Sequence, residues 1–182
     1  MQACEQTQGQ SVLAHGQAVH EAYLECWHAG QSGSFPRGWR QPKWWNAQSA
    51  HRLVELQPSL EIMEDYHVFH DCGKPYCRTV DDQGRVHFPD HARLSAQIWQ
   101  QLGGSSEQAW LMSQDMLFHT GTAQDIDAIG THPLAPALLM TALAELHANA
   151  PLFGGIHTDS FKAKAKRLER RGAQLMRLLE LR

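Results

Sequence analysis

The sequence predicts an all-α protein with one small β-hairpin. Apolar residues recur at helical spacing through most of the chain, and Ser11 and Asn46 stand where two of these segments begin, as helix-capping residues do. A single segment shows the β-branched residues and turn of a hairpin. With 182 residues, the chain has the length of one domain with a hydrophobic core. We therefore expect one domain over residues 1–182.

The expected helices follow one another along the chain. The first covers residues 11–28, where Val12, Val19 and Tyr23 recur at helical spacings. Pro58 ends the second helix, because proline cannot continue it. The remaining helices are expected over residues 46–57, 60–70, 90–102, 105–119, 134–149 and 160–181.

Two segments interrupt the helical pattern. In residues 77–88, β-branched residues flank an Asp-Asp-Gln-Gly turn, which predicts a short hairpin. Residues 29–45 are rich in Gly, Ser and Pro and also carry tryptophan and arginine. This stretch is too long for a simple connector, so we interpret it as an insertion that is either functional or mobile.

Composition excludes several classes of protein. No apolar run approaches the roughly 18 to 20 residues that span a bilayer, and the first residues lack the features of a signal peptide, so we expect no membrane association. The net charge of −3 argues against a globally basic nucleic-acid binder but allows a local basic site. The cysteines fit neither a zinc knuckle nor a CxxC pair, and we expect reduced thiols in a cytoplasmic protein.

The most informative segment is His70-Asp71, at the end of a predicted helix and followed by Gly-Lys-Pro. His91 opens a later helix, and His119 closes the next one. Residues at helix ends can converge on one point, and imidazole nitrogen with carboxylate oxygen suits Mn, Fe, Ni, Co or Zn. These residues predict a centre with one or two divalent metal ions.

The segment HDCGKPYCRTVDDQGRVHFPDHARLSAQIWQQL resembles the HD-domain metal-dependent phosphohydrolases of the HDIG type. The likeness is greatest to the HD domains of bacterial CCA-adding enzymes and of ribonuclease Y. SVLAHGQAVHEAYLEC is similar to the first helix of the ribonuclease, and LFHTGT stands where the family has a histidine pair before glycine. The resemblance covers most of residues 11–180 and is most specific at 69–96. It implies a single HD-type helical bundle with a small hairpin after the HD motif.

The resemblance also implies a role for each matching residue. The implied metal ligands are His15, His70, Asp71, His91, His119 and Glu145. Glu145 is the nearest match to an acid that the family places in an Ala-Asp setting, and Thr120 replaces the second histidine of the pair. His51 is a rival for the first ligand, although the pattern around His15 matches better. Asp71 would link the ion to a proton relay or to a second ion, and Lys74 would meet a substrate phosphate.

The insertion and the hairpin supply candidate substrate contacts. Aromatic faces stack on bases and arginine meets phosphates, so Trp39, Arg37 and Arg40 could hold a nucleotide together with Arg78. The alternative is that the tryptophans pack under the loop as a satellite core while the arginines are solvated. Both interpretations stay open at this point.

The implied function is metal-dependent phosphohydrolysis, as a phosphomonoesterase or phosphodiesterase. The substrate would be a nucleotide, a cyclic nucleotide or a short RNA phosphate end, attacked by metal-activated water. Lys74 favours hydrolysis over the di-iron oxygenases of the same fold, and a non-catalytic nucleotide-sensing module is the third hypothesis.

Eight of the 16 basic residues lie between Lys162 and Arg182, on a helix whose regular apolar seam allows packing on the core or on a second copy in a homo-oligomer.

Overall fold

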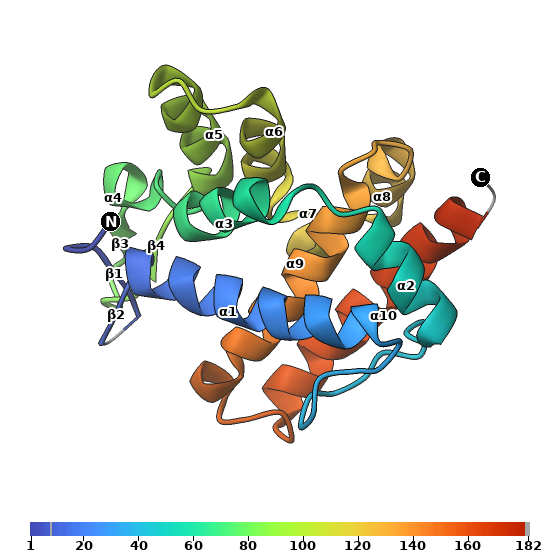
Figure 1. Ribbon diagram of the computed structural model, residues 1–182. Helices are drawn as coiled ribbons and strands as arrows, with labels where there is room; N and C mark the ends of the chain where they lie inside the picture. Colours follow the sequence, from blue (N-terminus) through green and yellow to red (C-terminus); the bar gives the residue numbers. More distant parts are fainter. Residues whose placement is uncertain (8, 181–182) are drawn as a thin grey trace. The chain divides into compact units, whose positions relative to one another are not determined.

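The computed structural model describes residues 1–7 and 9–180 and is built mostly of α-helices (Figure 1). This confirms the predicted all-α class. The chain divides into two compact units, one made of residues 1–20 and 59–115, the other of residues 21–58 and the chain from Met116 onward. Helix α1 (Val12–Gln31) contributes residues to both. The single domain over residues 1–182 stays a prediction.

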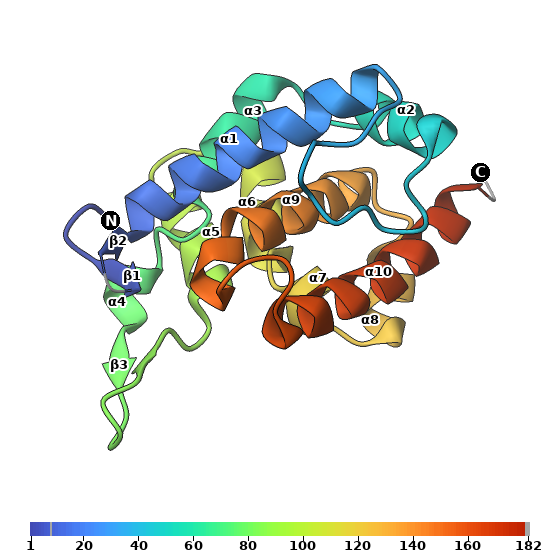
Figure 2. The same ribbon diagram turned by 90° about the horizontal axis from the view of Figure 1, so that it is seen from below.

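The first unit combines the start of α1 with short β-hairpins and further helices. These elements are β1 (Glu5–Thr7), β2 (Gln10–Ser11), α3 (Leu60–Phe69), α4 (Lys74–Cys77), β3 (Thr79–Val80), β4 (Val86–His87), α5 (His91–Gln101) and α6 (Ser106–Gln114). Helices α5 and α6 lie side by side, and α6 also contacts α3 (Figure 1). The antiparallel β3–β4 hairpin extends from this unit and confirms the hairpin predicted after the HD motif (Figure 2).

The second unit is organised around one apolar helix, α9. Its elements besides the end of α1 are α2 (Ala47–Glu55), α7 (Leu117–Thr120), α8 (Ala123–Ile129), α9 (Ala135–Ala148), the 3₁₀-helix η1 (Ala150–Phe153) and α10 (Asp159–Glu180). Most side chains of α9 are buried, which explains its nearly continuous apolar sequence. Helix α10 runs beside α9 and also contacts α7 and α8 (Figure 2).

Helix starts coincide with the residues that can cap them. Asn46 and Ser49 form a reciprocal capping box at α2, and the Ser11 hydroxyl accepts a hydrogen bond from the Ala14 N–H at 3.1 Å. Ser59 accepts a hydrogen bond at the start of α3, and Ser105 forms a reciprocal capping box with Gln108 at the start of α6. The predicted starts near residues 11, 46, 60 and 105 are therefore confirmed within a residue or two.

One predicted helix is wrong in extent. Residues 105–119 form two helices, α6 and α7, which are separated at Asp115. Asp115 is buried, and its carboxylate accepts a 2.6 Å hydrogen bond from the Tyr66 hydroxyl on α3. The chain turns at this residue. Asp115 is also the last residue of the first unit, and the sequence of the second unit resumes at Met116.

The predicted C-terminal helix is α10. Phe161, Leu168, Leu175 and Leu179 of its four-three seam are buried against the second unit, as the spacing predicts. Residue 181 of that prediction and the basic Arg182 lie outside the described residues. Among the helices of residues 1–7 and 9–180, none has both the length and the apolarity that crossing a membrane requires.

Candidate metal centre

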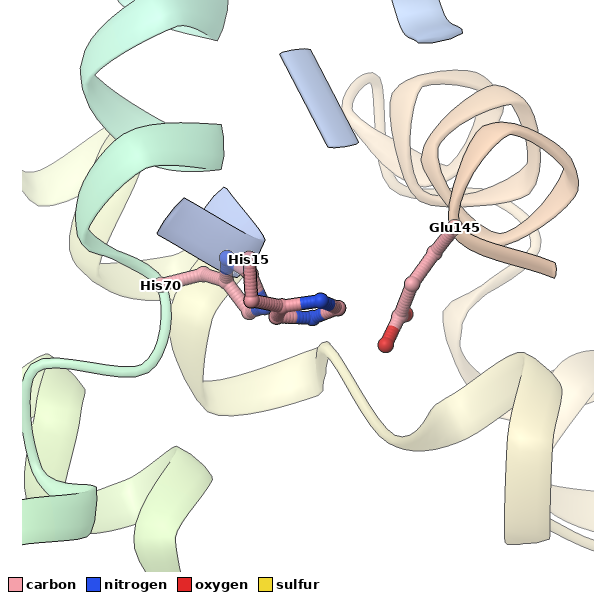
Figure 3. Close-up of side chains that lie close together, drawn as sticks. All are labelled: His15, His70 and Glu145. Carbon is pink, nitrogen blue, oxygen red and sulfur yellow. The ribbon is translucent and has the colours of Figure 1, made fainter. Parts of the chain in front are cut away.

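His15 reaches the HD motif because α1 and α3 approach each other at a glycine. A Cβ atom on Gly16 would lie 2.5 Å from the Val68 carbonyl oxygen and 2.7 Å from that of His67. Only glycine fits this contact without a shift of backbone. The neighbouring His15 on α1 is thereby placed beside His70 at the end of α3, with ring centroids 5.4 Å apart (Figure 3).

A second glycine brings the HD turn against α5. The Gly73 N–H donates a 2.9 Å hydrogen bond to the Ser95 hydroxyl, and a Cβ on Gly73 would lie 2.6 Å from the Ser95 nitrogen. The same Cβ would lie 2.8 Å from the His91 carbonyl oxygen. Glycine at this position therefore lets the start of α5, which carries His91, approach Asp71.

The Asp71 carboxylate is the centre of the resulting cluster. Oδ2 lies 3.2 Å from the His70 Nε2 and 3.8 Å from the His15 Nε2, while Oδ1 lies 3.5 Å from the His91 Nε2. Asp71, His15 and His70 are almost completely buried, and His91 is partly buried. The first unit thus gathers three of the six predicted metal ligands, His15, His70 and His91, around the carboxylate of a fourth, Asp71.

The chemistry and spacing of this cluster fit a divalent metal ion. Ligand atoms bonded to one ion at about 2.1 Å lie about 3.0 to 3.5 Å apart at usual bond angles, close to the distances around Asp71. His15 and His70 can each offer an imidazole nitrogen to such an ion. The Asp71 Oδ1 is buried and accepts no hydrogen bond from the described residues, so it retains a lone pair for an ion.

Backbone carbonyls fix the orientation of two of the imidazoles. The His70 Nδ1–H donates to the His67 carbonyl oxygen at 2.7 Å, and the His91 Nδ1–H donates to the Phe88 carbonyl oxygen at 2.8 Å. A carbonyl oxygen only accepts, so Nδ1 carries a proton in both rings, and Nε2 is the nitrogen that faces Asp71. This arrangement is typical of metal-binding histidines.

Asp71 is held as an anion. Burial alone would raise its pKa, but the charge and hydrogen bond of His70, followed by the charges of Lys74 and His15, lower the pKa well below its usual range. The Lys74 ammonium lies 2.5 Å from Oδ2 and is itself buried. A permanently ionised carboxylate is the form that binds a cation.

Sequence reasoning missed one partner of Lys74. The Lys74 Nζ donates a 2.8 Å hydrogen bond to the Gln6 side-chain oxygen on β1, and it lies 5.4 Å from the centre of the Phe88 ring. No motif in the sequence points to Gln6, because its strand is three residues long and polar.

The other two predicted ligands belong to the second unit. His119 on α7 and Glu145 on α9, the third residue labelled in Figure 3, form an ion pair with 2.8 Å between Nε2 and Oε2. Arg171 on α10 donates a 2.8 Å hydrogen bond to the Phe118 carbonyl oxygen and so holds the end of α7 that carries His119. The predicted ligand set is therefore divided between the units.

His51, the rival first ligand, lies on the exposed side of α2 in the second unit. Within the first unit, His15 lies 3.8 Å from the Asp71 carboxylate. The choice of His15 over His51 as the first ligand stays a prediction.

The insertion is packed into the second unit by its aromatic residues. Trp44 and Trp45 are buried, and Trp39 stacks on the His147 ring of α9 with centroids 4.3 Å apart. The Arg40 backbone N–H donates to the His147 Nε2 at 3.0 Å. These contacts favour the satellite-core interpretation for the tryptophans. The side chains of Arg37, Arg40 and Arg78 are exposed.

The contact between the insertion and α9 is expected to be sensitive to acid. Burial lowers the pKa of His147 to about 4, and protonation would place a hydrogen on Nε2, facing the Arg40 N–H. The unfolded chain takes up this proton near pH 6.5, so the stabilisation is complete above that pH and is lost as the pH falls to about 4. We expect the free energy of unfolding to fall by about 3 kcal/mol over this window.

Chemical denaturation between pH 7 and 4 measures this loss. A His147→Leu variant should lose most of the pH dependence, whereas His28→Gln, a change at an exposed histidine of α1, should keep it. Equal slopes for the parent and His147→Leu would contradict the prediction.

Comparisons with family models, with curated proteins and with solved structures find no match for this chain.

Proposed function

We propose that the chain is a metal-dependent phosphohydrolase acting on the phosphate of a nucleotide, a cyclic nucleotide or a short RNA end. The observation that carries this proposal is the cluster around Asp71, in which three imidazole nitrogens lie 3.2 to 3.8 Å from one buried carboxylate. The sequence resemblance to HD-domain phosphohydrolases supports the same assignment.

Each residue of the cluster has a defined task in this proposal. His15, His70 and His91 supply neutral nitrogen ligands, and Asp71 supplies the negative charge that balances a divalent cation. A bound divalent ion lowers the pKa of water toward neutrality and polarises a phosphoryl oxygen. Lys74 donates hydrogen bonds from a fixed positive charge to the phosphate oxygens of the substrate.

Lys74 also favours hydrolysis of phosphate esters over oxygenation. Its ammonium is buried beside the carboxylate, where a positive charge is useful for an anionic substrate.

Two results would favour the alternative functions. Oxygen-dependent turnover with iron would favour a di-iron oxygenase, and tight nucleotide binding without turnover would favour a sensing module.

The proposal is tested by elemental analysis of the purified protein together with a substrate panel. The panel contains 5′-, 3′- and 2′-nucleoside monophosphates, 2′,3′-cyclic nucleotides, nucleoside triphosphates and short RNA ends, each assayed with Mn, Ni, Co and Fe. We expect bound metal and hydrolysis of at least one phosphate ester. Protein that binds none of these metals, or that hydrolyses none of these substrates when loaded, would contradict the proposal.

A matched pair of histidine variants tests the choice of first ligand. His15→Ala is expected to weaken metal binding by about 100-fold, because it removes one neutral donor from the cluster. His51→Ala, on α2, should bind metal as the parent does. Isothermal titration with Mn²⁺ measures both, and the reverse ranking would show that His51 is the ligand.

His119→Ala and Glu145→Gln test the remaining assignments in the same titration. We propose that His119 and Glu145 serve the same centre, on the strength of the resemblance. A second metal equivalent that disappears in both variants is the expected result, and unchanged stoichiometry and affinity would remove these residues from the ligand set.

A further inference from the structure

The N-terminal hairpin contains an irregularity at one residue. Strand β1 pairs with β2 through Glu5 opposite Ser11 and Thr7 opposite Gln10, so that the register shifts between Glu5 and Thr7. Gln6 is the extra residue at this shift. A bulge of this kind re-aims the side chain that it carries and is common beside active sites.

The side chain of Gln6 is directed at the lysine of the HD motif. Its carbonyl oxygen accepts a 2.8 Å hydrogen bond from the Lys74 Nζ, across 68 residues of sequence. The same ammonium contacts Asp71 at 2.5 Å and faces the Phe88 ring. Lys74 therefore has a carboxylate, an amide oxygen and an aromatic face as neighbours.

Of these neighbours, Gln6 is the neutral hydrogen-bond acceptor. A cation bound by Asp71 competes with Lys74 for that carboxylate and repels its ammonium. The amide oxygen of Gln6 is uncharged and does not depend on the Asp71 carboxylate. It therefore continues to accept the hydrogen bond from the Lys74 ammonium when a cation is bound to Asp71. A long flexible lysine side chain would otherwise lose its orientation.

We propose that Gln6 is a positioning residue that holds the Lys74 ammonium in place to receive the phosphate group of an anionic substrate. This inference rests on the proposed function for the identity of the substrate. Gln6 acts through Lys74 and does not itself touch the reacting atoms. The N-terminal hairpin is then part of the phosphate-binding site.

The test measures the binding of inorganic phosphate to the Mn²⁺-loaded full chain by isothermal titration. Gln6→Met removes the acceptor while keeping a side chain of similar length. We expect about tenfold weaker phosphate binding, as for the loss of one hydrogen bond to a charged group, with unchanged Mn²⁺ affinity. The matched control is Gln10→Met on β2, whose side-chain oxygen makes no hydrogen bond to the described residues. This control should bind phosphate as the parent does.

A double variant separates positioning from a general effect on the hairpin. In a Lys74→Met background, adding Gln6→Met should change phosphate affinity by less than about twofold, because Gln6 acts through the lysine. If the tenfold loss persists in that background, or if Gln10→Met reproduces it, Gln6 is not a positioning residue. A parent protein that binds no phosphate also overturns the inference.

The outcomes for this inference and for the proposed function are distinct. Phosphate binding with the expected dependence on Gln6, but without hydrolysis of any ester, keeps the inference and overturns the hydrolase. Hydrolysis with KM and phosphate affinity unchanged in Gln6→Met keeps the hydrolase and overturns the inference.

Discussion

Replacing Asp71 by asparagine is expected to abolish metal binding and to lower phosphate-ester hydrolysis on the order of 10³-fold, the scale of a metal ion's contribution. The carboxylate is the common neighbour of His15, His70 and His91, and its charge would balance that of a divalent ion. An amide of the same shape keeps an oxygen but loses that charge. Elemental analysis and the phosphate-ester assay measure the two losses.

The same variant is expected to be less stable even without metal. Asparagine leaves the buried Lys74 ammonium without its carboxylate partner, and breaking a buried ion pair from one side costs about 3 kcal/mol. The double variant Asp71→Asn with Lys74→Met removes both charges and should regain most of this loss. Urea unfolding of the metal-free proteins measures the difference.

The double variant also separates folding from chemistry. It should remain unable to bind metal although its stability is restored. Metal binding by either variant at the affinity of the parent would contradict the role given to Asp71, and a stable single variant would contradict the role of the buried pair.

Replacing Gly16 by alanine is expected to destabilise the protein by roughly 3 kcal/mol. The new Cβ would meet the carbonyl oxygens of Val68 and His67 at 2.5 and 2.7 Å, and backbone atoms of α3 cannot move aside as a side chain can. His15 would be displaced together with α1, so Mn²⁺ binding should weaken by about tenfold as well.

The sign of the change makes this experiment decisive. In an open helical position, alanine instead of glycine stabilises a protein by about 1 kcal/mol, so a gain in stability would show that α1 and α3 are not in close contact. Gln17→Ala, at the next and exposed position of α1, should change stability by less than about 0.5 kcal/mol. Thermal and urea unfolding of both variants provide the comparison.

The sequence predicts most of the helices and the His70-Asp71 pair of the cluster because their signals are local. Helix caps such as Asn46 and Ser105 lie within three residues of the groups that they bind. His70 and Asp71 are adjacent, and His91 begins the helix after the hairpin, so the pattern allows them to converge. It is the resemblance that assigns His91 and His15 to the same centre.

What the sequence does not predict depends on contacts between distant residues. Gln6 meets Lys74 only because a bulge turns it toward α4, and the strand that carries it shows no apolar alternation. Likewise, the stack of Trp39 on His147 joins the two separate stretches of sequence that make up the second unit. The break at Asp115 is not apparent in the sequence because apolar spacing continues across it, while the hydrogen-bond partner of Asp115, Tyr66, lies on α3.

The interleaving of the two units along the chain has a consequence for synthesis on the ribosome. The residues of α1 emerge first, yet Gly16 and His15 cannot meet their contacts until the segment with Val68 and Asp71 has followed. The first unit is completed only when Asp115 has left the exit tunnel, and the second awaits α10, whose Phe161 and Leu175 fill its core. Nascent chains released before α10 should therefore contain a first unit that can fold and an incomplete second unit. Apolar surface of α9 would stay exposed in that second unit, and chaperone binding and aggregation would compete for it.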